Sequence, residues 1–277
     1  MRDRERRITY RGPWASSPGG ECQPWGVRRS FNELVNEAAH APIGVWDFGW
    51  LDGRATEERP SWRYFDRVAE RAATVSRMLD LQTGAGQMIA DLPKLPRLTV
   101  ATEGHNPNVA IASCRLRQRG AWLVRTQEDR PALPLASNSF ELVTSRHPVD
   151  TRWDEIARVL RSGGTYLSQQ VGPHSLRDLS ELMMGPLPPG SKRDPELARV
   201  AAEKAGLKVT DLRHERLRTV FYDIGAVIYF LRLVVWIVPD FTIEKYREEL
   251  LALHHRIERE GGFETSASRF LIEAVKD

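Results

Sequence analysis

Short apolar runs alternate through the middle of the chain with segments in which apolar residues recur at helical spacing. The helical segments begin near residues 62, 106 and 151, and each leads into one of the apolar runs. The runs have the length and composition of buried strands. They cover residues 75–81, 98–103, 121–125, 140–145 and 165–170. Strands separated by single helices predict a parallel, doubly wound α/β sheet.

The pattern is less regular after residue 170. It predicts a sixth strand, an apolar helix, an amphipathic helix and a final strand, at residues 206–212, 224–238, 242–260 and 266–275. We therefore expect a Rossmann-like, mostly parallel sheet of seven strands, with an N-terminal lid segment before Trp62 and a C-terminal helical insertion. Such additions commonly cover the carboxyl ends of the strands, where ligands bind.

The chain divides into a mobile basic arm at residues 1–30 and one domain at residues 31–277. Within that domain, residues 62–170 are the expected cofactor-binding core, and residues 171–277 supply substrate-side helices and the last strands. The formal net charge is only +3, and much of the excess arginine lies in the arm. A solvated leader is more common than a nucleic-acid-binding arm for so short a basic run. We assign the arm no function and expect no nucleic-acid partner.

Cysteine content and hydropathy predict a cytoplasmic protein without a membrane partner. Cys22 and Cys114 cannot build a disulfide framework, and the N-terminus is charged rather than apolar. The most apolar segment, residues 224–238, is shorter than a membrane span and contains Arg232. A buried cap helix and a homodimer interface are the two interpretations of that segment. No metal site is expected. The adjacent His254 and His255 would point about 100° apart on a helix, so they could not bind one metal ion together.

The loop after the first strand carries the strongest functional pattern. It reads DLQTGAG from Asp80 to Gly86, and Gly84 and Gly86 permit close approach of the backbone to a ligand. Glu103 ends the second strand, where a carboxylate can accept hydrogen bonds from both hydroxyls of a ribose. The loop and this carboxylate predict a site for an adenosine-type cofactor.

Three further motifs follow in order: Asp129 before Leu133-Pro134, the strand NSFELV from Asn138, and the turn IARVLRSGG that ends at Gly164. With these motifs the chain resembles the class I methyltransferases that use S-adenosylmethionine, of the type 11 kind. The resemblance covers about residues 75–170. It implies a methyltransferase enzyme, S-adenosylmethionine as cofactor, and a cofactor-binding set that maps onto Asp80, Gln82, Thr83, Gly84, Ala85, Gly86, Glu103, Gly104, Asp129, Arg130 and Ser145.

The resemblance also assigns parts of the cofactor to residues. Asp80 and the glycine loop would hold the methionine end, Glu103 the ribose, and Asp129 the adenine amino group. Gln82 is a departure, since the family usually has glycine there. Its side chain must point either outwards or at the cofactor, where its amide could donate a hydrogen bond.

The segment after the fourth strand faces the methyl group in this fold. It reads SRHP from Ser145 and lacks the Asn/Asp-Pro-Pro-aromatic signature of enzymes that methylate planar amines. We therefore expect a small-molecule acceptor methylated at oxygen or nitrogen. With a pKa near neutrality, His147 could act as the general base or orient the acceptor. Trp50 and Tyr222 lie in aromatic segments that flank the core, and both could line an acceptor pocket.

Three other functions remain open at this stage. An RNA methyltransferase is supported by the basic arm, but the core lacks a long basic stripe with interleaved aromatics. A nicotinamide-dependent oxidoreductase is disfavoured because Ile89 stands where GxGxxG needs its third glycine. The chain would be a non-catalytic S-adenosylmethionine-binding protein if Gln82 abolished turnover.

Overall fold

A computed structural model describes residues 29–43, 48–126, 132–189 and 192–277. In these ranges the strands form one mixed sheet of eight, in the order β1-β7-β8-β6-β5-β2-β3-β4. The prediction of seven strands was one short, because β1 (Ala55–Glu57) pairs antiparallel with the edge of the expected sheet. Residues 1–28 of the predicted basic arm lie outside the described ranges.

The parallel part of the sheet lies where the sequence predicted it. Its five strands are β2 (Arg77–Leu81), β3 (Leu98–Glu103), β4 (Trp122–Arg125), β5 (Phe140–Arg146) and β6 (Leu160–Val171). The helices that connect or flank them are α2 (Tyr64–Thr74), α3 (Gln87–Ala90), α4 (Asn106–Arg117) and α5 (Trp153–Val159). Their apolar residues form two buried clusters, one on each face of the sheet. Buried strands between two helical layers give the expected doubly wound core.

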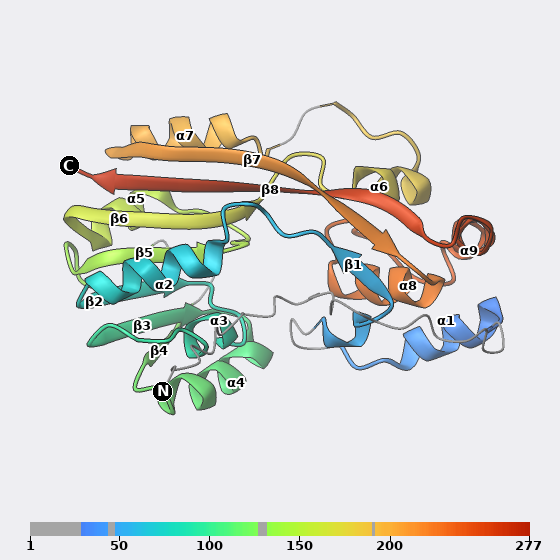
Figure 1. Ribbon diagram of the computed structural model, residues 1–277, viewed down its shortest axis with the longest axis horizontal. Coiled ribbons are helices and arrows are strands. Elements are labelled where there is room, and N and C mark those ends of the chain that lie inside the picture. Colours follow the sequence, from blue (N-terminus) through green and yellow to red (C-terminus); the bar gives the residue numbers. More distant parts are fainter. Residues whose placement is uncertain (1–28, 44–47, 127–131, 190–191) are drawn as a thin grey trace, which may run out of the picture.

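Two long antiparallel strands extend this core. β7 (Leu207–Phe221) has 15 residues and β8 (Phe263–Lys276) has 14, and both exceed their predicted lengths. β8 pairs with β6 on one side and β7 on the other. Helix α7 (Pro195–Lys204) precedes β7 and packs beside it. Figure 1 shows β7 and β8 running out of the parallel core into a second group of helices.

This second group, which we call the helical lobe, has its own buried apolar cluster. It contains α1 (Phe31–His40), the 3-10 turn η1 (Gly49–Leu51), α6 (Arg177–Met184), α8 (Ile224–Leu233) and α9 (Arg247–Glu260), with β1 and the adjoining ends of β7 and β8. Helix α8 is buried from Ile224 to Leu231. The complete burial of these eight residues within one chain favours the cap-helix interpretation over an interface helix.

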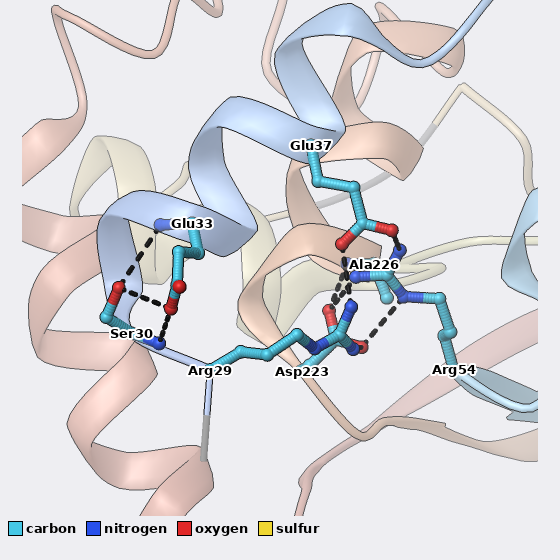
Figure 2. A network of polar contacts seen from close by, with 7 residues as sticks. All are labelled: Arg29, Ser30, Glu33, Glu37, Arg54, Asp223 and Ala226. Carbon is cyan, nitrogen blue, oxygen red and sulfur yellow. Dashed lines mark hydrogen bonds and ion pairs between the residues drawn. The ribbon is translucent and has the colours of Figure 1, made fainter. Parts of the chain in front are cut away.

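A network of polar contacts joins α1, the residue before β1 and the start of α8 inside the helical lobe (Figure 2). Asp223 caps α8 by accepting from the amide of Ala226, and it also accepts two hydrogen bonds from Arg54 at 2.8 Å each. Arg54 reaches Glu37 of α1 at 3.0 Å. Ser30 and Glu33 form a capping box at the start of α1. The network fixes α1 against the start of α8.

No helix in the described ranges is both long enough and apolar enough to span a membrane. In the same ranges, no group of three or more histidine, cysteine, aspartate or glutamate side chains gathers where it could hold a metal ion.

Candidate cofactor and acceptor site

The site is built at the carboxyl ends of β2, β3 and β5, which lie side by side in the parallel core. Asp80 is buried near the end of β2, and its carboxylate accepts a hydrogen bond from the hydroxyl of Thr144 on β5 at 2.6 Å. Burial raises the pKa of Asp80 to about 6, against the opposing effect of that hydrogen bond. A cationic ligand beside Asp80 would favour its charged form.

The chain turns sharply after β2. Gly84 and Gly86 both have positive φ, at 62° and 74°. A Cβ at Gly84 would project into open space, whereas one at Gly86 would lie 3.1 Å from a side-chain carbon of Leu116. Gly84 therefore leaves room for a ligand, and Gly86 allows α4 to pack closely against the turn. Between them, Ala85 accepts a hydrogen bond from Arg115 through its carbonyl.

Glu103 joins this turn to the end of β3. Its carboxylate accepts backbone hydrogen bonds from Gly84 at 2.7 Å, from Gly104 at 2.9 Å and from His105 at 2.7 Å. A carboxylate offers about four lone-pair directions, so these three bonds orient the group and leave acceptor capacity beside the glycine turn. That geometry suits a hydroxyl donor such as a ribose.

Two buried polar atoms lack a hydrogen bond of good geometry within the described residues: Asn108 Oδ1, and Thr83 Oγ1, which nevertheless lies close enough to Asp80 to lower the pKa of that carboxyl. Thr83 belongs to the glycine turn, and Asn108 lies in the first turn of α4 after β3. Buried polar atoms normally have partners, and a partner at such a position is often a ligand. With the acidic groups and the open space at Gly84, they fit a cofactor that carries an amino acid and an adenosine.

Gln82 does not face that space. It has a positive φ of 54°, and its amide bonds to the backbone of the loop after β5. Its Nε2 donates to the carbonyl of Asp150 at 2.6 Å, and its Oε1 accepts from the amide of Val149 at 2.7 Å. The side chain thus ties the cofactor loop to the loop that follows His147, which is a different role from either cofactor contact or free exposure.

Ser145 is fully engaged inside the protein. Its hydroxyl shares hydrogen bonds with the hydroxyls of Tyr166 at 2.7 Å and Ser168 at 2.9 Å. Its carbonyl accepts from Tyr64. The structure therefore places this residue at the predicted strand end, with its hydroxyl in the core of the sheet.

His147 lies just beyond the end of β5 with a positive φ of 52°, which is uncommon for a residue other than glycine. Its amide donates to the carbonyl of Gln169, and its Nε2 lies 3.0 Å from Nε2 of Gln169. Burial lowers the pKa of His147 well below its ordinary value, and the charges of Arg269, Arg146 and Arg193 lower it further. The near-neutral pKa on which general-base catalysis would depend is thus not produced by these surroundings.

Trp50 and Tyr222 lie in the helical lobe, and their contacts are with that lobe. Trp50 stacks on Tyr229 with ring centroids 4.7 Å apart, and the guanidinium of Arg54 lies 3.7 Å from its ring centroid. Tyr222 is 43% exposed, and its hydroxyl is 3.2 Å from that of Thr56. These contacts lie within the helical lobe, and the acceptor-pocket role of the two residues stays a prediction.

Asp129 and Arg130, predicted to hold the adenine, lie outside the described residues. Sequence reasoning missed Gln169, Thr144 and Arg146, which lie on neighbouring strand ends beside His147 and Asp80. The only signal for them was position. Each lies at or near the carboxyl end of a predicted parallel strand, where functional side chains concentrate.

Comparisons with known proteins agree with this geometry. Residues 79–168 match the family model described as a methyltransferase domain. The YcgJ protein from Bacillus subtilis is 16% identical, with a TM-score of 0.54 over 78% of this chain and 99% of that chain. A putative methyltransferase from Bacillus halodurans is 16% identical, with a TM-score of 0.53 over 76% and 98%. No functionally curated protein matches the sequence.

The two structural relatives, at such low identity, establish the fold, and the family match covers the turn after β2, the end of β3 and the end of β5. These are the strand ends that bring Asp80, Glu103 and the glycine turn together. The chain therefore carries a methyltransferase domain at residues 79–168, on a Rossmann-like α/β fold, and is an enzyme.

Proposed function

We propose that the enzyme transfers a methyl group from S-adenosylmethionine to an oxygen or nitrogen atom of a small-molecule acceptor in the cytoplasm. The observation that carries the cofactor assignment is the Glu103 carboxylate, held by three backbone amides beside a glycine turn with open space at Gly84. Asp80, Thr83 and the turn would hold the methionine end, and Glu103 the ribose. Asp129 and Arg130 remain the predicted adenine contacts.

S-adenosylmethionine supplies an electrophilic methyl group on a sulfonium, which the acceptor atom attacks in line. Because positive charge disperses during the transfer, the protein contributes mainly alignment and exclusion of water. Gln82 would assist by fixing the loop of Val149 and Asp150 to the cofactor turn. An acceptor that already has a free lone pair needs no base at His147.

The helical lobe supports a small acceptor. It adds buried apolar helices next to the core, and such additions commonly form the wall of a substrate pocket. Lid and pocket roles for α1 and α8 stay part of this proposal. A homodimer would show as twice the chain mass in solution, and an RNA acceptor would depend on the basic arm at residues 1–30.

Calorimetry tests the cofactor. The purified chain is expected to bind S-adenosylhomocysteine and not NADH, since the turn lacks a complete pyrophosphate site. Binding of NADH without any response to S-adenosylhomocysteine would overturn the assignment. Formation of S-adenosylhomocysteine with small-molecule extracts, retained after removal of the first 20 residues, would favour a metabolite over RNA; activity on RNA alone would reverse that choice.

A further inference from the structure

One buried amide close to the proposed cofactor site has an oxygen without a donor. Asn108 is 1% exposed, and its Oδ1 makes no hydrogen bond of good geometry among the described residues. In the unfolded chain water bonds to this atom, so burying it without a partner costs free energy. Leucine has nearly the same size and would avoid that cost. The cost is offset when a bound ligand brings the donor.

Helix α4 places this amide on the face that packs against the cofactor turn. Asn108, Ala112 and Leu116 are the buried residues of α4, and they share one helix face because they follow one another at intervals of four. That face meets the turn after β2, since a Cβ at Gly86 would lie 3.1 Å from Leu116 and 3.4 Å from Ala112. Side chains of a helix lean toward its N-terminus, so the amide of Asn108 leans toward the start of α4.

The start of α4 is bonded to Glu103. The Glu103 carboxylate accepts from the backbone amide of His105 at 2.7 Å, and the His105 carbonyl accepts from the backbone amide of Asn108 at 3.0 Å. In the strand order β5-β2-β3-β4, Asp80 bonds toward β5, whereas α4 follows β3. Asn108 therefore lies on the side of Glu103, the proposed ribose contact, and not on the side proposed for the methionine end.

The donor groups of S-adenosylmethionine can be assigned in turn. They are the ammonium of the methionine end, the two ribose hydroxyls and the amino group of adenine. Under the proposed function the ammonium lies at Asp80 and the glycine turn, and both hydroxyls donate to Glu103. The amino group has two N–H bonds, and Asp129 is the predicted acceptor of one. The other N–H bond is the donor that this assignment leaves over.

We propose that Asn108 Oδ1 accepts the second N–H bond of the adenine amino group and thereby selects adenine as the base of the cofactor. The inference rests on the proposed function and adds a contact that the sequence motifs did not assign. An acceptor at this place favours an amino group and disfavours a base with a carbonyl oxygen there, because two acceptors would then face each other.

The first measurement is urea unfolding of the ligand-free chain. Asn108→Leu replaces an amide that lacks a donor with an apolar side chain of similar size, so its unfolding midpoint should exceed that of the wild type. Leucine also favours helix more than asparagine does. Asn36→Leu, at an exposed position of α1, is the control for that propensity. A rise no larger than that of the control would show that Asn108 is satisfied within the protein and would overturn the inference.

The second measurement is calorimetry of the full chain with S-adenosylhomocysteine and with S-inosylhomocysteine, in which a carbonyl oxygen replaces the adenine amino group. Asn108→Leu should weaken binding of S-adenosylhomocysteine by roughly tenfold, because a hydrogen bond to the amino group is lost. Binding of S-inosylhomocysteine should not weaken, because that ligand has no amino group. Asn36→Leu should bind both ligands as the wild type does.

The outcomes separate this inference from the proposed function. If the wild type does not bind S-adenosylhomocysteine, the proposed function fails and the inference fails with it. If the wild type binds and Asn108→Leu binds equally well, only the inference fails. Equal weakening of both ligands would assign Asn108 to the ribose and contradict the contact with adenine. A more stable protein with a selective loss of S-adenosylhomocysteine affinity is the result that supports the inference, and a purely structural asparagine would not give it.

Discussion

The parallel core and the helical lobe share β7 and β8 but use polar groups in different ways. At the edge of the core, the carboxylates of Asp80 and Glu103 bond to a hydroxyl and to backbone amides beside an open glycine turn. In the helical lobe, Asp223 and Arg54 bond to each other and to a helix start. The same residue types therefore prepare a ligand site in one region and hold helices together in the other.

A substitution at Glu103 tests the contrast between the two regions most directly. Replacing it with alanine should weaken binding of S-adenosylhomocysteine by roughly 2 to 4 kcal/mol, because charge-assisted bonds to the ribose and to the turn are lost together. Calorimetry measures the change. Glu264→Ala is the matched control, since its carboxylate is 60% exposed and pairs with Arg218 in the helical lobe. Unchanged affinity in a folded Glu103→Ala protein would remove this residue from the cofactor site.

Asp80 should make stability depend on pH. Its pKa rises from 3.8 to about 6 on folding, so between these values the folded state binds more protons than the unfolded state. The contribution of Asp80 to the free energy of unfolding should therefore decrease by about 3 kcal/mol in total as pH rises from about 3 to about 7, most of it between the two pKa values, and stay constant above.

The measurement is the difference between wild type and Asp80→Asn in urea unfolding at several pH values, which cancels the carboxylates with lowered pKa such as Glu141 and Asp211. Parallel pH curves for the two proteins would show that Asp80 is ionised normally in the fold.

In the helical lobe, Asp223→Ala should lower the free energy of unfolding by about 2 kcal/mol, because it removes the cap of α8 and leaves Arg54 without its principal partner. Affinity for S-adenosylhomocysteine should not change. Asp240→Ala serves as the control, because its pair with Lys245 is about half exposed. A large loss of cofactor affinity in Asp223→Ala would show that the lobe and the cofactor site are coupled.

The smallest expected effect concerns His147. Because burial and three arginines lower its pKa, its ring should remain neutral from pH 6 to 8. Nuclear magnetic resonance of the histidine ring protons should therefore show no titration of His147 in that interval. Titration of His147 near pH 6.5 would restore the general-base role.

Motif order was enough to place the parallel core. Asp80, Gly84, Gly86 and Glu103 meet as expected, because each motif follows a strand and parallel strands end at one edge. The helical lobe carries no such motif, so sequence periodicity indicated its helices but not their partners. Trp50 illustrates this, because the aromatic composition of its segment was visible in the sequence but its stacking partner, Tyr229, was not.

The directions of individual side chains could not be predicted from the sequence either. Ser145 and Gln82 lie at the expected positions. The hydroxyl of Ser145, however, points into the sheet, and the amide of Gln82 bonds to a neighbouring loop. The direction depends on partners that are distant in sequence, such as Tyr166 and Asp150. The hydrogen bonds that join Trp62, Gln169 and His147 were missed for the same reason, because these residues are separated by up to 107 positions.

The position of β8 has a consequence for how the protein is made. β8 is the last strand in chain order, yet it occupies the middle of the sheet between β6 and β7. During synthesis β6 therefore keeps an open edge, and β7 has no inner neighbour, until β8 leaves the ribosome. The parallel strands can assemble earlier, but joining them to the helical lobe must wait for this strand. A nascent chain that stalls after α9 would expose two unpaired strand edges, and such edges favour aggregation.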